Sequence, residues 1–515
     1  MTDYAIELRH ITKTFGKVVA NRDVSMFVHK GEILSLLGEN GSGKTTLMNM
    51  IAGIYYPDSG EILVDGTVAE IRSPRDAMRL KIGMVHQHFK LINVFTAAEN
   101  IALVMEHKGK YSLKSVKARA QEICDQYGFD LDLDQKVYEM SVSQKQTLEI
   151  VKVLFEGADL LILDEPTAVL TPQETERLFN VMRAMRNNGK SIIIITHKLH
   201  EVLEISDRVV VLRKGEYVGD VLTRDATSAV LTEMMVGQKV SLNIGRSDPR
   251  ELHIRLAVRH LSVLNAENVK VLDDVSFDAF GGEILGIAGI SGNGQKELLE
   301  AIAGLQKGAE GSSVIYYPDD DRDSTAEQLL GKPPAAIRKM GVHLSFVPED
   351  RLGMGLVGSM GMADNMMLKS YKEGHTPLVQ RNAPRKLARE IRESLGVITP
   401  SIQTPVSRLS GGNVQKVLVG REIAAAPTVL MTAYAVRGLD INTSYTIYRL
   451  LEEQKRQGVS VIYVGEDLDV LIELCDRILV LCGGKMNGIL DARKTTKEQV
   501  GLLMTKLADK EGMDR

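Results

Sequence analysis

Residues 32–53 read EILSLLGENGSGKTTLMNMIAG, and this stretch decides the fold. Its first six residues, 32–37, form a short apolar run that predicts a buried strand. Residues 38–45, GENGSGKT, fit the pattern G-x-x-x-x-G-K-[ST], and residues 45–52 are expected to form a helix. Glycine-rich turns let backbone N–H groups surround phosphate oxygens, and the positive end of the following helix attracts them. The stretch therefore predicts a phosphate-binding loop between a strand and a helix.

A second stretch, residues 160–165 (LLILDE), supports this interpretation because it is an apolar run that ends in two acids. Asp164 is expected to bind Mg²⁺ through water, and Glu165 to orient and activate a water that attacks a phosphate. Lys44 is expected to reach the β- and γ-phosphates of a nucleotide, and the Thr45 hydroxyl to hold Mg²⁺. A chance glycine-rich match is the alternative for the loop. An ordinary pair of acids at a strand end is the alternative for Asp164 and Glu165, but it does not explain their spacing from the loop.

The chain repeats itself. Residues 23–53 (DVSMFVHKGEILSLLGENGSGKTTLMNMIAG) correspond to residues 274–304 (DVSFDAFGGEILGIAGISGNGQKELLEAIAG), 251 positions later. Later landmarks, such as Asp207 and Asp476, lie 269 positions apart. The second half therefore carries a net insertion, part of which is the polar segment 319–332. We expect a first domain over residues 4–240, a polar linker at 241–251 and a second domain over residues 252–507.

Apolar strands alternate with helical segments in both halves, which predicts an α/β fold with a mostly parallel sheet in each. The 515 residues carry 63 basic and 67 acidic side chains, and this balance argues against a nucleic-acid partner. Three cysteines without a CxxC pair favour a reducing compartment. We expect no signal peptide and no membrane span, since the apolar runs fall short of about 20 residues.

Residues 409–416, LSGGNVQK, closely resemble the signature motif of ABC ATPases. The resemblance covers nearly the whole chain and implies two tandem ABC-type P-loop domains, each with a helical subdomain. In that family two domains pack head to tail, and each ATP lies between one phosphate loop and the other domain's signature. The resemblance also implies that Gln87 senses Mg²⁺ and the membrane partner, and that His197 contacts the γ-phosphate. The implied nucleotide contacts are Phe15, Gly38, Glu39, Asn40, Gly41, Ser42, Gly43, Lys44, Thr45, Thr46, Ser410, Gly411 and Gly412.

The repeat allows each site residue to be compared between the halves. The second half has lost almost every group that the first half supplies to chemistry. Lys44, Thr45, Gln87, Asp164, Glu165 and His197 correspond to Gln295, Lys296, Glu349, Ala433, Tyr434 and Glu466. The first half has a poorer signature, with Ser143 where the second half has Gly412. Under head-to-tail packing these losses fall in one composite site, so we expect one working catalytic site and one degenerate site.

Fused two-domain chains of this kind resemble the ATP-binding subunits of simple-sugar and nucleoside importers. This resemblance implies two membrane permease subunits, a solute-binding protein and a peripheral position on the cytoplasmic side of the cell membrane. Residues 84–101, 164–174 and 432–440 favour the nucleoside branch. The alternative is a soluble twin-ABC translation factor that acts on ribosomes, although those usually keep both sites.

The surface after Gln87 is expected to contact the membrane partner. The matching stretch of the second half carries Met354, Met360, Met362, Met366 and Met367. Methionine suits an adaptable binding surface, and a Met-rich core helix is the alternative.

Overall fold

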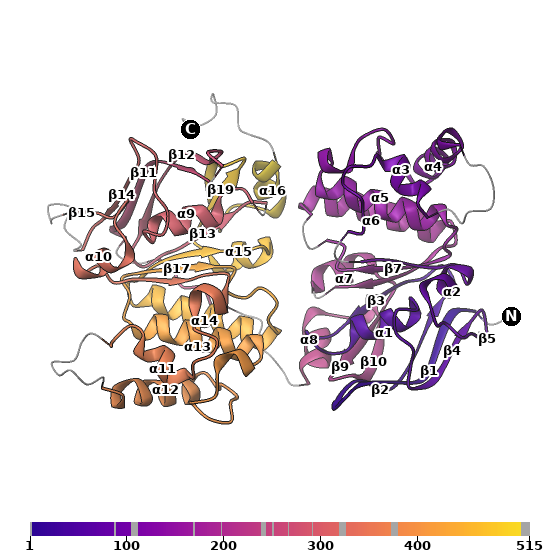
Figure 1. The fold of residues 1–515 in the computed structure, drawn as a ribbon, viewed down its shortest axis with the longest axis horizontal. Helices are drawn as coiled ribbons and strands as arrows, with labels where there is room; N and C mark the ends of the chain where they lie inside the picture. The colour runs from indigo at the N-terminus through magenta and orange to yellow at the C-terminus, as the bar shows by residue number, and fades with distance from the viewer. Residues whose placement is uncertain are drawn as a thin grey trace. The chain divides into compact units, whose positions relative to one another are not determined.

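The computed structural model describes residues 3–86, 89–104, 112–167, 170–196, 198–237, 244–249, 252–265, 267–290, 292–318, 326–371 and 380–505. The chain forms two compact units, Met1–Val240 and Ser241–Arg515. Both are built from the same strands and α-helices in the same order (Figure 1).

The main sheet of the first unit has six strands in the order β10-β9-β3-β8-β7-β6. Five of them are parallel, and β10 pairs antiparallel at one edge. Residues in β3, β7 and β8 are apolar almost throughout because helices or a second sheet cover both faces. The strands are β3 (Ile33–Leu37), β6 (Ile82–Val85), β7 (Leu160–Asp164), β8 (Ser191–Ile195), β9 (Arg208–Arg213) and β10 (Glu216–Leu222).

A separate antiparallel sheet, ordered β2-β1-β4-β5, packs beside the main one. Its strands are β1 (Tyr4–Phe15), β2 (Val18–His29), β4 (Ser59–Val64) and β5 (Thr67–Val68). Ile6, Leu8 and Ile11 of β1 are buried with Leu47 and Ile51, which lie on the helix after the phosphate loop.

Helices complete the layers of the first unit (Figure 1). Alternate residues of the central strands face opposite ways: Leu34 packs towards α1 and the antiparallel sheet, whereas Ile33 packs towards α6. The helices are α1 (Lys44–Ile51), α2 (Pro74–Arg79), α3 (Ala97–Ala102), α4 (Leu113–Tyr127), η1 (Val137–Glu139), α5 (Val142–Phe155), α6 (Pro172–Asn187), α7 (Leu199–Ile205), η2 (Thr223–Asp225) and α8 (Ser228–Val236). Helices α3, α4 and α5 share a core of their own, which is the expected helical subdomain.

The second unit repeats this architecture, with sheets β16-β17-β18-β13-β19-β20 and β12-β11-β14-β15. The strands are β11 (Ile254–Leu264), β12 (Lys270–Phe280), β13 (Ile284–Ala288), β14 (Ser313–Tyr316), β15 (Glu327–Gln328), β16 (Leu344–Val347), β17 (Val429–Ala433), β18 (Ser460–Val464), β19 (Arg477–Cys482) and β20 (Lys485–Asp491). The helices are α9 (Gln295–Ile302), α10 (Pro334–Lys339), η3 (Arg351–Gly355), α11 (Met362–Met367), α12 (Asn382–Ser394), η4 (Val406–Arg408), α13 (Gly411–Ala424), α14 (Ile441–Arg456), α15 (Leu468–Leu474) and α16 (Lys497–Thr505). The predicted α/β class with two tandem cassettes is confirmed.

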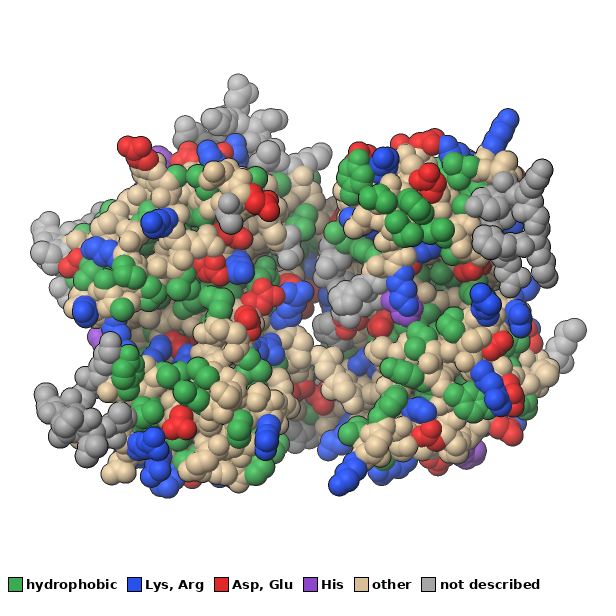
Figure 2. Space-filling model, viewed as in Figure 1, with side chains coloured by type: hydrophobic (Ala, Val, Ile, Leu, Met, Phe, Trp, Pro, Cys, Tyr) green, Lys and Arg blue, Asp and Glu red, His purple; other side chains and the backbone are tan. Residues whose placement is uncertain are grey.

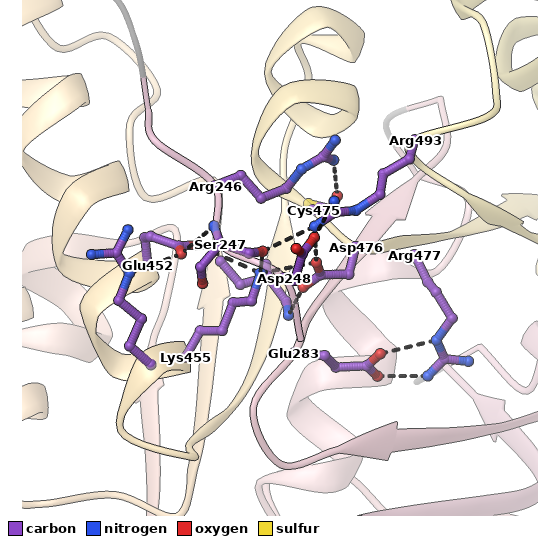
Figure 3. Close-up of polar contacts among 12 residues, drawn as sticks. Arg246, Ser247, Asp248, Glu283, Glu452, Lys455, Cys475, Asp476, Arg477 and Arg493 are labelled. Carbon is purple, nitrogen blue, oxygen red and sulfur yellow. Dashed lines mark hydrogen bonds and ion pairs between the residues drawn. The ribbon is translucent and has the colours of Figure 1, made fainter. Parts of the chain in front are cut away.

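Residues 244–249 lie in the segment expected to be a linker, yet they are bound to the second unit; we call them the strap (Figure 3). Ile244 is part of the second unit's core. The Ser247 backbone N–H donates to Glu452 Oε1 at 2.7 Å, and Lys455 Nζ donates to the Ser247 carbonyl at 2.7 Å. Arg246 donates to the Cys475 carbonyl at 2.5 Å. These bonds hold the strap against α14 and the segment before β19.

Buried charges lie beneath the strap. The side chain of Lys455 is 1% exposed and pairs with Asp476 at 2.9 Å. The equivalent pair in the first unit is Arg186 with Asp207, also at 2.9 Å, but the Arg186 side chain is 32% exposed. The strap therefore covers a charge pair whose counterpart in the first unit faces solvent.

Candidate functional site

The phosphate loop of the first unit connects β3 to α1, as the sequence predicts. Gly43 has φ +93°, a left-handed conformation that glycine adopts without strain. A Cβ at this position would lie 2.4 Å from the Ala20 carbonyl oxygen, so a side chain cannot be accommodated. The N-terminus of α1 thus opens directly onto the loop, with backbone N–H groups available for an anion.

Lys44 is buried under this loop. Its Nζ donates to the Gly38 carbonyl at 2.6 Å and to the Glu39 carbonyl at 3.0 Å. Burial lowers the pKa of Lys44, and the nearby carboxylates of Glu165 and Asp164 oppose this effect. The lysine therefore lies within electrostatic reach of both acids that follow β7.

Two hydroxyls of the loop have different surroundings. Ser42 is buried, and its Oγ makes no hydrogen bond to the residues that the structure describes. Thr45, on the first turn of α1, is exposed. A buried hydroxyl without a partner costs free energy, and phosphate oxygens would satisfy it. This observation supports the predicted anion site.

Asp164 ends β7 and Glu165 follows it. Burial raises the pKa of Asp164 to about 6, the Glu165 carboxylate adds to the rise, and Lys44 opposes it. Glu165 has φ +48°, a strained backbone for a residue with a side chain, and its N–H donates to Ile195 O at 2.8 Å. The structure brings Lys44, Asp164 and Glu165 into one electrostatic cluster, in which two carboxylates face one lysine.

Phe15 lies at the end of β1 and is exposed. Its ring meets Tyr55 edge-on with centroids 5.2 Å apart, and Lys13 Nζ lies 5.6 Å from its centroid. An exposed ring on a rigid strand can stack on a purine base. Gln87 and His197, both predicted site residues, lie outside the described residues.

The second unit's loop keeps the backbone conformation but not the lysine. Gly294 has φ +96°, like its counterpart Gly43. Gln295 takes the place of Lys44 and donates to the Ile290 carbonyl at 3.1 Å, so a neutral amide fills the lysine's position. Asn293, the counterpart of Ser42, accepts a hydrogen bond from the Gly483 N–H at 3.2 Å.

Tyr434 has φ +51° and donates its N–H to Val464 O at 3.0 Å, as Glu165 does in the first unit. Next to it the Arg437 guanidinium donates to Glu349 Oε1 at 2.6 Å and lies 3.2 Å from Glu466 Oε1. Burial, with Glu466 and Glu349, raises the pKa of Tyr434 to about 12. The degenerate positions therefore form an ion-paired cluster, which sequence comparison missed because Arg437 corresponds to Ala168.

The signature residues stand at the start of α13. Ser410 is the N-cap and Gly411 is the first helical residue. A Cβ on Gly412 would lie 3.3 Å from Asp440 Oδ2, so the position has little room. In the first unit, Ser141 caps α5 and accepts from the Gln144 N–H at 3.2 Å.

Apolar side chains are exposed after the Gln87 position and after its counterpart Glu349. They are Ile92, Val94 and Leu103 in the first unit and Leu352, Met354, Val357 and Met360 in the second. Met362 and Met366 are instead buried in the core. Met362 and Met366 are therefore core residues, whereas the exposed Met354 and Met360 remain candidates for the predicted binding surface. Over the face that Figure 2 shows, basic and acidic side chains are interspersed, with apolar ones between them.

Comparisons with known proteins agree with this geometry. The family model described as ABC transporter matches residues 21–168 and 272–432. The nucleoside import ATP-binding protein NupA of Lactococcus lactis subsp. cremoris is 39% identical, covering 97% of both chains. The guanosine import ATP-binding protein NupO of Bacillus subtilis is 39% identical over 99% of both. The ribose import ATP-binding protein RbsA 1 of Rubrobacter xylanophilus is 37% identical, covering 97% of this chain and 98% of the relative.

The chain belongs to the ABC transporter family and carries two tandem cassettes. It is an ATPase of that family. Within the described part of the chain, every helix is too short or too polar to span a bilayer.

Proposed function

We propose that this chain is the ATP-hydrolysing subunit of an importer for nucleosides or simple sugars, with its catalytic chemistry confined to the first unit's phosphate loop. The observation that carries the proposal is the cluster of Lys44, Asp164 and Glu165 next to a loop whose backbone N–H groups can bind an anion. The second unit has a neutral amide, Gln295, in place of Lys44, and it has Ala433 and Tyr434 in place of the two acids. Relatives named for nucleoside, guanosine and ribose import support the solute class.

Each residue has a distinct role in the proposed hydrolysis. Lys44 exchanges its two loop carbonyls for phosphate oxygens. Glu165 orients a water and accepts its proton as the oxygen attacks the γ-phosphorus and the bond to the bridging oxygen breaks. His197 contacts the γ-phosphate, and Phe15 stacks on adenine. The remaining loop residues supply backbone N–H groups and the Ser42 and Thr46 hydroxyls.

The donor set also fits Mg²⁺, which prefers oxygen ligands. The exposed Thr45 hydroxyl, the Asp164 carboxylate and the Gln87 amide oxygen would hold it. The raised pKa of Asp164 supports this assignment, because a buried pair of acids is relieved by a cation. Bound Mg²⁺ would neutralise charge on the phosphates.

The second unit contributes Ser410, Gly411 and Gly412 to the working site under this proposal. Its own degenerate loop, facing Ser141 and Ser143, does not hydrolyse ATP. The start of a long helix at Gly411 supports the first role, since N-terminal N–H groups attract phosphate.

The exposed apolar side chains after the Gln87 and Glu349 positions are the proposed contacts to two membrane permeases. A solute-binding protein would select the solute. The chain would therefore lie peripherally on the cytoplasmic side of the membrane, attached through the permeases.

Steady-state ATP hydrolysis by the full-length chain tests the catalytic assignment. Lys44→Ala and Glu165→Gln should each nearly abolish activity. Tyr434→Phe, at the position equivalent to Glu165, is the matched control and should keep most of it. Normal turnover with Glu165→Gln would contradict the assignment. Co-fractionation with ribosomes instead of permease-containing membranes would favour the translation-factor alternative.

A further inference from the structure

A buried carboxylate joins the two strand ends that carry the predicted catalytic residues. Glu201 lies on α7, and its side chain is 2% exposed. Its Oε2 accepts a hydrogen bond from Thr167 Oγ1 at 2.6 Å and another from Thr196 Oγ1 at 3.3 Å. Its Oε1 lies 3.0 Å from Lys198 Nζ. One side chain therefore binds the segments after β7 and β8 together.

Lys198 reinforces the same connection. Its Nζ donates to the Thr167 carbonyl at 3.0 Å, and its backbone N–H donates to Thr196 Oγ1 at 3.1 Å. Lys198 thus neutralises Glu201 and also holds Thr167 from a second direction. We call Thr167, Thr196, Lys198 and Glu201 the bracket.

The bracket residues are close in sequence to the two proposed catalytic residues, Glu165 and His197. Thr167 follows Glu165 by two residues, while Thr196 and Lys198 flank His197. Glu165 itself is held in a strained left-handed conformation, which persists only when its surroundings fix it. Glu201 binds the backbone segment that follows Glu165 and the segment that contains position 197, because it accepts from both Thr167 and Thr196.

The second unit shows that the fold does not require the bracket. The corresponding residues are Val436, Gly465, Asp467 and Val470, and Val436 and Val470 pack against the apolar core. Strands β17 and β18 and helix α15 nevertheless form as their counterparts do. The bracket is thus present in the unit that carries Glu165 and replaced by apolar packing in the unit that carries Tyr434.

We propose that Glu201 is a positioning residue for ATP hydrolysis, which acts through Thr167, Thr196 and Lys198 to hold Glu165 and His197 at their working separation. The proposal rests on the roles proposed above for Glu165 and His197. Glu201 itself touches neither nucleotide nor water in this mechanism.

Glu201→Gln tests it, because the amide keeps the size of the side chain but presents an NH₂ group to a threonine hydroxyl or to Lys198. In the full-length chain, kcat should fall about 10- to 100-fold, since small misplacements of catalytic groups carry penalties of this order. The KM for ATP and the affinity for a fluorescent ATP analogue should change less than about threefold, because the phosphate loop is untouched.

Glu32→Gln is the matched control. Glu32 is also a buried, ion-paired carboxylate of the first unit, bonded to Arg208 Nε at 2.8 Å, but it precedes β3 at the end opposite the phosphate loop. Glu32→Gln should lower the melting temperature about as much as Glu201→Gln does, and it should leave kcat near the wild-type value. Thr167→Ala should reproduce the kcat loss, and Thr167→Ser, which keeps the hydroxyl, should restore most of it.

The outcomes separate two kinds of failure. If Glu165→Gln is inactive while Glu201→Gln keeps full kcat, the positioning role is wrong and the catalytic assignment stands. An equal loss of kcat in Glu201→Gln and Glu32→Gln would make the role merely structural and would also overturn the inference. If Glu165→Gln is itself fully active, the catalytic assignment in the proposed function is wrong, and the role inferred for Glu201 falls with it.

Discussion

At the scale of single residues, Asp164 shows a conflict between folding and function. Its carboxylate is largely buried beside Glu165, and its pKa is raised to about 6. An acid with a raised folded-state pKa contributes stability below its unfolded pKa, and that contribution is lost as the pH rises through the folded value. The nucleotide-free chain therefore bears a destabilising charge at neutral pH, which a bound cation would offset.

Asp164→Asn should remove this cost. At pH 7.5 and without nucleotide or Mg²⁺, the variant should be more stable than wild type by about 1–2 kcal/mol, after discounting for partial exposure. The difference should shrink between pH 6 and pH 4, because wild-type Asp164 then becomes protonated in the folded state as well. Thermal unfolding across this pH range measures the effect. A stability gain that is the same at pH 4 and pH 7.5 would contradict the electrostatic cause.

The same substitution should abolish Mg²⁺-dependent ATP hydrolysis, because an amide cannot replace the carboxylate that the metal needs. Phosphate release at saturating ATP provides the measurement. If the Asn variant is more stable and also fully active, the assignment of Asp164 as a Mg²⁺ ligand is wrong.

The residues that sequence could identify are those in short contiguous patterns. Lys44 and Glu165 follow from motifs of eight and six residues. Glu201 and Arg437 could not be identified in this way, because their meaning depends on contacts between segments. Glu201 reaches Thr167, which is 34 residues away, and Arg437 reaches Glu349, which is 88 residues away.

At the scale of elements, the central parallel strands could be predicted because burial on both faces makes them continuously apolar. The antiparallel sheet could not, since β1 departs from strict alternation and pairs with β2 through several register shifts. The strap was also missed. Its polar composition is typical of a linker, but its backbone polar groups are bonded to buried charges of the second unit.

Lys455→Ala tests how much the strap network stabilises the second unit. The substitution leaves Asp476 buried without its nearest counter-charge and removes one of the two cations beside the buried Glu452, which should cost about 3 kcal/mol. Hydrogen–deuterium exchange should show α14 and strap peptides losing about 100-fold in protection, while peptides of the first unit stay unchanged. Arg186→Ala, at the equivalent and more exposed pair, should cost about 1 kcal/mol or less. Equal effects at the two positions would mean that the strap adds nothing to the buried pair.

At the scale of the whole molecule, the replaced site residues are not scattered over both of the proposed composite sites. They are concentrated in one of the two. The first unit's loop keeps Lys44 and Thr45, and the second unit's signature keeps Gly411 and Gly412. Independent drift of the two halves would mix intact and altered residues in both sites. Under the proposed pairing across the halves, one site keeps all of its residues and nearly every residue of the other is altered.

Gly412→Asp tests this pairing because Gly412 belongs to the half without catalytic acids. A carboxylate there should repel the γ-phosphate and reduce hydrolysis about 100-fold or more, corresponding to about 3 kcal/mol of lost transition-state stabilisation. Ser143→Asp, the equivalent change facing the degenerate site, should reduce it much less. Both variants are compared at saturating ATP.

Asp440 requires a further control, since a carboxylate at position 412 would also be repelled inside the second unit. The melting temperature of each variant separates this local strain from a loss of catalysis. Equal activity losses at both positions, or a larger loss at Ser143, would show that Lys44 and Gly412 do not act in one site.

The strap also sets the length of the tether between the two units. With residues 244–249 bound to the second unit, six residues separate Gly237 from Ile244, and even a fully extended chain of this length spans only about 25 Å. Short tethers of this kind raise the effective concentration of one partner around the other to the millimolar range. Each cassette would therefore encounter its own covalent neighbour far more often than a cassette of another copy. Under the proposal that only the first unit's loop is catalytic, the chain depends on that bias, because two second-unit loops brought together from different copies would hydrolyse nothing.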